Sequence, residues 1–231
     1  MPTEKDVYTL HPSQYDRLIL REDFHNNILS AIQKIIPLTD KHVVDLGTGT
    51  GRLARLLSPL TQSILAMDIS PYMLQVAKES LSKTTAKNWL MAAADNSHLP
   101  VKSATADIVV SGWSFCYLAV WGGDAWRSAL QNGLKEIKRV IRKGGKVIIL
   151  ETMGTGFETP NPPPHLANYF AFLKENGFSF TWIRTDYQFE SLQEAEELST
   201  FFFGKELTAK VRKNKWVILP ECTGVWWLNM K

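Results

Sequence analysis

A short apolar run that ends in an acid and continues into a glycine-rich turn is the feature that most constrains this chain. It extends from Val43 to Gly51, and residues 42–46 are predicted to form a buried strand. Glycines let the backbone adopt positive φ and approach a ligand closely. In doubly wound α/β sheets, ligands bind at such a turn, outside the carboxyl end of the strand. The sequence therefore predicts a ligand crevice directly after residue 46.

Further β-rich runs alternate with helical patterns, which predicts a parallel sheet with crossover helices. Their nearly continuous apolar character is typical of strands buried on both faces. The expected strands span residues 63–68, 89–94, 107–111 and 146–152. Beyond a Gly- and Pro-rich loop, we expect a helix over 166–176, a strand over 178–187, a polar helix over 192–211 and a last strand over 216–228.

These elements predict a single α/β domain over residues 1–231, with a doubly wound, mostly parallel seven-stranded sheet. The last two strands are expected to be antiparallel neighbours at the sheet edge. Residues 41–152 would form the cofactor-binding core, and residues 153–231 would complete the sheet and the substrate side. Residues 1–40 would form a helical lid that includes a helix over 23–36, capped by Asp23.

Acidic residues end the first three predicted strands: Asp45, Asp68 and Asp95. Because parallel strands present their carboxyl ends at one edge, these acids should converge on one crevice. Asp45 would attract an ammonium group of a ligand, Asp68 could accept both hydroxyls of a ribose, and Asp95 could accept from the amine of a base. The alternative for each acid is a structural role in capping the next element.

The glycine spacing separates two classes of ligand. A dinucleotide-binding turn has the pattern G-x-G-x-x-G, and its third glycine would fall at Arg52. The glycines are instead Gly47, Gly49 and Gly51, and a pyrophosphate would be repelled by Asp45. The spacing therefore disfavours an NAD(P)-dependent oxidoreductase, which remains the enzymatic alternative.

Several motifs resemble those of class I S-adenosylmethionine-dependent methyltransferases, in particular the small-molecule (methyltransferase type 11, quinone-biosynthesis-like) group. They are D-L-G-T-G-T-G at 45–51, M-D-I-S-P-Y-M-L at 67–74, A-A-D-N at 93–96 and D-I-V-V-S at 107–111. The resemblance implies a Rossmann-like methyltransferase fold, S-adenosylmethionine as cofactor and methyl transfer to a small-molecule acceptor. A cofactor-binding regulator or pseudoenzyme on the same fold is the non-enzymatic alternative.

The same resemblance implies roles for individual residues. Gly47, Thr48 and Gly49 would contact the methionine part of the cofactor, with Asp45 and Ser111 near its amino group. Its adenosine would lie between Ile69 and Met73, with Asn96 lining the adenine pocket. Tyr15 in the N-terminal segment would lie over the cofactor.

No motif assigns a catalytic residue. Trp113 and Tyr117 follow the fourth strand and are candidates for the wall of the acceptor site. Four histidines are candidate general bases, although an isolated histidine is more often a surface residue: His11, His25, His98 and His165.

Composition excludes other functions. With 26 Lys and Arg against 23 Asp and Glu, the net charge of +3 does not favour nucleic acid as a partner. Enzymes that methylate amino groups of nucleic acids have a Pro-Pro-aromatic motif after the fourth strand. This chain has no such motif after residue 111. The two cysteines form neither a disulfide framework nor a metal site and fit a reducing, cytoplasmic setting. No apolar run approaches the roughly 18 residues that span a bilayer.

Overall fold

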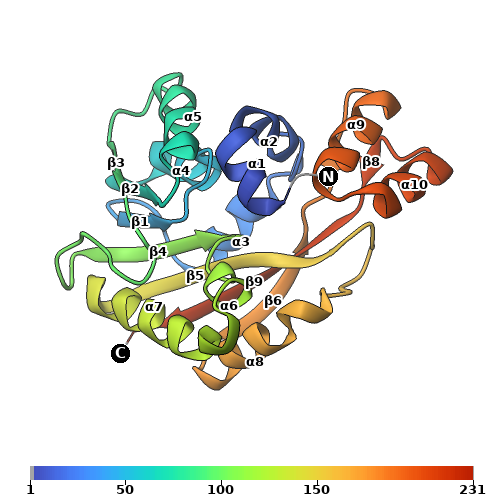
Figure 1. Ribbon diagram of the computed structural model, residues 1–231. Coiled ribbons are helices and arrows are strands. Elements are labelled where there is room, and N and C mark those ends of the chain that lie inside the picture. Colours follow the sequence, from blue (N-terminus) through green and yellow to red (C-terminus); the bar gives the residue numbers. More distant parts are fainter. Residues whose placement is uncertain (1–2, 231) are drawn as a thin grey trace.

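The strands of the computed structural model, which describes residues 3–230, form a seven-stranded sheet in the order β3-β2-β1-β4-β5-β9-β6 (Figure 1). The sheet is parallel except for β9, which pairs antiparallel with both β5 and β6. The strands are β1 (His42–Leu46), β2 (Ser63–Asp68), β3 (Trp89–Ala93), β4 (Ala106–Gly112), β5 (Ile141–Thr155), β6 (Ser179–Arg184) and β9 (Glu221–Asn229).

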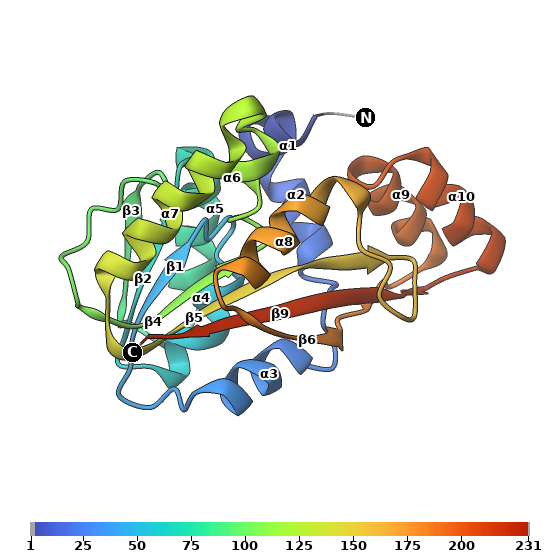
Figure 2. The ribbon, with the colours of Figure 1, turned by 90° about the horizontal axis from the view of Figure 1, so that it is seen from below.

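Helices cover both faces of this sheet (Figure 2). One face packs against α3 (Asn27–Ile35), α4 (Arg52–Leu57) and α5 (Pro71–Ser82). The other face packs against α6 (Tyr117–Val120), α7 (Trp126–Val140) and α8 (Ala167–Glu175). Short 3-10 turns lie at Ser58–Leu60, Gly123–Ala125 and Pro164–Leu166. The result is a three-layer arrangement in which most strands are buried on both sides, as their apolar runs predict.

Two segments lie beyond the carboxyl edge of the sheet. At the N-terminus, α1 (Glu4–Leu10) and α2 (Pro12–Ile19) lie between α5 and α9 (Figure 1). Near the C-terminus, α9 (Leu192–Phe202) and α10 (Lys205–Asn214) pack on a small ribbon of β7 (Tyr187–Gln188) and β8 (Ile218–Leu219). Leu18 of α2 is fully buried in the apolar cluster of this C-terminal segment, so the two segments share one core.

The first strands form where the sequence predicts them, because β1 and β2 have the predicted bounds. The helix predicted over 23–36 begins four residues later, at Asn27. Asp23 still caps it, since its carboxylate accepts from the backbone amides of Asn27 (2.8 Å) and Ile28 (3.0 Å). Its backbone has φ of 62°, which takes residue 23 itself out of the helix.

The C-terminal elements are more divided than predicted. The helix expected over 192–211 is two helices, since Gly204 adopts φ of 84° between them. The expected strands over 178–187 and 216–228 each separate into a sheet strand and a ribbon strand, with Pro220 dividing the second pair. As predicted, the last two strands of the sheet, β6 and β9, are antiparallel neighbours at its edge; β6 is outermost and β9 lies one place inside.

Within residues 3–230, no helix is long and apolar enough to cross a membrane. The same residues contain no group of three or more His, Cys, Asp or Glu placed to hold a metal ion.

Candidate functional site

A cavity of about 830 Å³ opens at the carboxyl ends of β1, β2, β4 and β5. The N-terminal helices and the end of α9 contribute to its walls. All three strand-end acids line it, so the strands bring Asp45, Asp68 and Asp95 together as their order predicts. It is also lined by the other predicted site residues except Ser111, namely Tyr15, Gly47, Thr48, Gly49, Ile69, Met73, Asn96, Trp113 and Tyr117.

Asp45 is fully buried at the base of the glycine-rich turn. Its Oδ2 accepts a hydrogen bond of 2.6 Å from the hydroxyl of Thr48, whereas its Oδ1 has no partner among the described residues. Burial raises the pKa of Asp45 to about 7, although the Thr48 bond favours the charged form. A buried carboxylate oxygen without a partner is costly, so it suits a site that a ligand completes.

Gly47 can only be glycine in this turn. Its φ is 63°, and a Cβ at this position would lie 1.7 Å from the Oγ atom of Ser114. The loop after β4 therefore closes directly on the loop after β1. Gly49 also has positive φ, and there a Cβ would meet only the terminal methyl of Met73, at 3.9 Å.

Asp68 fastens the end of β2 to its surroundings through both oxygens. Oδ2 accepts from the backbone amide of Gly49 and Oδ1 from that of Ser70, each at 2.8 Å. Burial raises the pKa of Asp68, and these backbone bonds oppose that shift. Each oxygen keeps a free lone pair, so both structural and ligand-binding roles are open to this carboxylate.

Asp95 and Asn96 form the far end of the cavity, after β3. Asp95 Oδ1 accepts from the backbone amide of Ser97 at 2.7 Å, and the hydroxyl of Ser97 lowers the pKa of this carboxyl. Asn96 donates to the Ser114 hydroxyl at 3.4 Å. Ile69 is exposed on the adjoining rim.

Ser111, expected near the amino group of the cofactor, does not line the cavity. Its side chain is buried inside the sheet, and its hydroxyl donates to the backbone carbonyl of Leu46 at 3.1 Å. Ser114, three residues further on, takes the place against the glycine-rich turn. The reason is that residue 111 still belongs to β4, whereas residue 114 lies in the loop that crosses the cavity.

Comparisons with known proteins identify a domain in the middle of the chain. The family model described as "Methyltransferase domain" matches residues 44–149. The chain contains a methyltransferase domain. A domain of this family implies S-adenosylmethionine as the cofactor.

Individual relatives agree with this family. A demethylmenaquinone methyltransferase of Thermotoga maritima is 27% identical over 181 residues, which are 73% of this chain and 69% of that protein. An uncharacterized methyltransferase of Mycobacterium tuberculosis is 31% identical over 117 residues, 51% of this chain and 42% of that protein. A SAM-dependent methyltransferase from Aquifex aeolicus shares the fold, with a TM-score of 0.58 at 16% identity over 97% of this chain and 92% of that one.

The matched segments thus span 69% of the Thermotoga protein and 42% of the Mycobacterium protein. What those proteins methylate is therefore not carried over with the family. The second half of the cavity is lined by residues that lie outside the motifs of the methyltransferase domain.

Tyrosines close the cavity from above. The hydroxyls of Tyr8 in α1 and Tyr117 in α6 lie 2.6 Å apart, and the ring of Tyr15 meets that of Tyr8 edge to face at 5.4 Å between centroids. The carbonyl of Tyr8 also accepts from the hydroxyl of Ser70, at the start of α5, at 3.0 Å. Helix α1 therefore bridges α5 and α6 across the cavity of the methyltransferase domain.

Trp113 forms part of the wall in a strained conformation. Its φ is 50°, in the left-handed region that costs a non-glycine residue roughly 1–3 kcal/mol. The guanidinium of Arg52 lies 4.5 Å from the centre of its ring. Of the histidines considered as bases, His165 lines the cavity, whereas His11, His25 and His98 do not.

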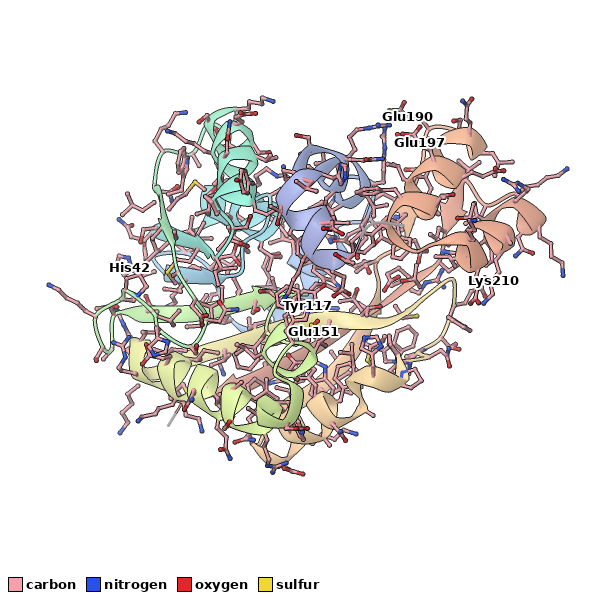
Figure 3. The ribbon with its side chains drawn as sticks, viewed as in Figure 1. His42, Tyr117, Glu151, Glu190, Glu197 and Lys210 are labelled. Atoms are coloured by element: carbon pink, nitrogen blue, oxygen red, sulfur yellow. The ribbon has the colours of Figure 1, made fainter. Side chains whose placement is uncertain are left out.

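Sequence reasoning missed four charged residues that line the second half of the cavity: Glu22, Arg52, Glu151 and Glu221. Glu151, at the centre of the molecule in Figure 3, accepts from the hydroxyl of Tyr169 (3.0 Å) and the amide of Cys116 (3.2 Å). Burial raises the pKa of Glu151 to about 7. A signal was present, because Glu151 follows the unbroken apolar run Val147–Leu150 and a charge there needs a specific reason.

Proposed function

We propose that this protein transfers a methyl group from S-adenosylmethionine to a small molecule bound between the ends of β4 and β5. The observation that supports it best is a single cavity that joins the motif residues to a second group of buried polar side chains. Its volume of about 830 Å³ lies within the 300–1,000 Å³ typical of small-molecule pockets. The bridge made by α1 further favours a small acceptor, because it leaves little room for a macromolecule.

The residues of the first half fit the cofactor. The unpartnered Oδ1 of Asp45 would accept from its ammonium group, beside Gly47, Thr48 and Gly49. Free lone pairs on Asp68 would accept from the ribose hydroxyls. Ile69, Met73, Asp95 and Asn96 would hold the adenine, and Tyr15 would cover it.

S-adenosylmethionine supplies a methyl group on a positively charged sulfur, which a nucleophile displaces while the bonding electron pair stays on sulfur. Because the leaving group is already activated, the protein has mainly to align the acceptor and exclude water. The tyrosine contacts between α1, α2 and α6 would exclude water from above.

The proposal extends to partners and location. The demethylmenaquinone methyltransferase of Thermotoga maritima has a name that supports a small organic acceptor. Nucleic acid is not proposed as a partner, in line with the small net charge. A cytoplasmic location is proposed on the two buried free thiols, Cys116 and Cys222.

Calorimetric titration with S-adenosylmethionine, S-adenosylhomocysteine and NAD tests the cofactor half. The first two should bind and NAD should not. Tight NAD binding without a response to S-adenosylhomocysteine would overturn the proposal. Formation of S-adenosylhomocysteine in the presence of an acceptor then separates an enzyme from a cofactor-binding regulator.

A further inference from the structure

In the second half of the cavity, where we place the acceptor, buried carboxylates outnumber the positively charged groups that could pair with them. Apart from the three acids assigned to the cofactor and the α1 residues Glu4 and Lys5, the charged side chains that line it are Glu22, Glu151 and Glu221, against the guanidinium of Arg52. All three glutamates are more than nine-tenths buried. Unpaired buried carboxylates are costly, so such an excess calls for a positively charged ligand.

Glu22 and Arg52 form an incomplete ion pair. Arg52 Nη1 donates to Glu22 Oε2 at 2.6 Å. The other atoms of the pair, Glu22 Oε1 and Arg52 Nη2, are buried and have no hydrogen-bond partner among residues 3–230, although the hydroxyls of Thr185 and Tyr187 lower the pKa that burial raises for Glu22. The pair is therefore oriented by a single bond and retains both an acceptor and a donor for a ligand.

Glu221 lies beside this pair and is also half-satisfied. Its Oε1 accepts from the hydroxyl of Thr152 at 2.7 Å, and its Oε2 is buried with no hydrogen-bond partner in the described part of the chain. The backbone brings the two glutamates together across one segment: Glu22 bridges to Tyr187, and the carbonyl of Glu221 accepts from the amide of Thr185. Burial, followed by the charge of Glu22, raises the pKa of Glu221 to about 8.

We propose that the methyl acceptor is an amine on an apolar body, bound as its ammonium form by the free oxygens of Glu22 and Glu221. This inference rests on the proposed function and specifies its acceptor. A carboxylate or phosphate acceptor would be repelled by these groups, and a neutral alcohol would leave their charge uncompensated. Aromatic side chains that also line the cavity suit an ammonium group and an apolar body: Tyr15, Trp113, Tyr187, Phe202 and Phe203.

The same geometry provides for the proton. An ammonium nitrogen has no lone pair and must lose a proton before it can be methylated. The Oε2 atom of Glu221 takes that proton, which leaves a neutral amine and a neutral carboxylic acid. Methyl transfer to the freed lone pair then gives a methylated ammonium ion and an uncharged thioether, so that the total charge is unchanged.

Matched probes test the charge preference on protein saturated with S-adenosylhomocysteine. Phenethylamine, phenethyl alcohol and hydrocinnamate share a ring and a short chain and differ in the terminal group; hexylamine, hexanol and hexanoate form a second set. By calorimetry, each amine should bind at least about tenfold more tightly than its alcohol, and the carboxylates should not compete. If neither amine binds more tightly than its alcohol, or if a carboxylate binds as well, the inference is wrong.

Glu221→Gln keeps the shape of the side chain and removes its charge, so it should lower amine affinity at least about tenfold. S-adenosylhomocysteine affinity should stay unchanged, which also shows that the variant is folded. Glu190→Gln is the matched control, because Glu190 lies at the periphery near α9 (Figure 3) and should leave amine binding unchanged. Equal amine affinity in wild type and Glu221→Gln would refute the assignment. If the wild type itself does not bind S-adenosylhomocysteine, the proposed function is refuted instead.

Discussion

The backbone amide of Gly49 donates a hydrogen bond of 2.8 Å to Oδ2 of Asp68. This bond fastens the glycine-rich turn after β1 to the acid at the end of β2. Since Asp68 also accepts from the amide of Ser70, one carboxylate holds the turn and the start of α5 in register. The two motifs are therefore parts of one cradle, and a substitution in either should affect the other.

Asp68→Ala should weaken S-adenosylhomocysteine binding by about 1.5–3 kcal/mol, the scale of hydrogen bonds to a charged group. It removes both the proposed ribose contacts and the bond to Gly49. Calorimetry gives the affinity and thermal unfolding gives the stability. Asp107→Ala is the matched control, because Asp107 lies at the opposite end of the sheet, against Arg142. Unchanged affinity with a collapsed melting temperature would show that Asp68 is only structural.

Gly47→Ala should destabilise the protein by about 1–3 kcal/mol and lower cofactor affinity, because it combines positive φ with a clash against Ser114. Adding Ser114→Gly should restore part of the affinity, since it removes the clash and leaves only the backbone strain. Gly123→Ala is the control, with φ of 52° and no atom within 4 Å of the new Cβ. If Gly123→Ala costs as much stability as Gly47→Ala, strain alone explains the effect.

Deletion of residues 1–10 tests the role of α1 as a lid. We expect a folded protein with weaker cofactor binding, because the deletion removes Tyr8 and its contacts to Ser70 and Tyr117. A longer deletion, to residue 20, would also remove Leu18 from the core and confuse the result. Tyr8→Phe should reproduce part of the loss, whereas Leu10→Ala, at an exposed position, should not. A truncated protein that binds S-adenosylhomocysteine as well as the full chain does would exclude the lid.

Glu151 should make stability depend on pH. Its pKa in the folded chain, about 7, lies above the ordinary 4.5, so the folded state binds more protons than the unfolded state between these values. As pH rises through this window, the wild type should lose stability relative to Glu151→Gln, by on the order of 3 kcal/mol in total. Urea unfolding at several pH values measures this difference. Tyr169→Phe removes a bond to the carboxylate and should move the window to higher pH; a pH-independent difference would contradict the assignment.

The sequence predicted the strand ends in the first half of the cavity well, because the information that specifies them is local. Residues 42–46 and 63–68 are apolar runs closed by acids, and each run specifies both a buried strand and the position of its acid. After β4, the serine that lines the cavity is Ser114 and not Ser111. Motif spacing identifies the end of β4 only to within a few residues. An error of three residues is enough to confuse the buried hydroxyl of Ser111 with that of Ser114, which lies against the glycine-rich turn.

The acceptor half could not be predicted in the same way. Glu151 and Glu221 lie 70 residues apart and share a site only because β9 enters the sheet between β5 and β6. Glu22 reaches the same site because its backbone forms a β-bridge with Tyr187. Arg52 reaches it because its guanidinium forms an ion pair with Glu22. These contacts depend on long-range packing, which no local pattern encodes.

The unpartnered oxygens of Glu22 and Glu221 have a consequence for engineering. Buried polar atoms without partners destabilise the empty protein, so substitutions that remove them should raise its melting temperature. A selection for heat resistance alone would therefore favour changes at the positions that the acceptor needs. In this protein, thermostability and substrate binding compete for the same few side chains, and a map of stabilising substitutions would also outline the site.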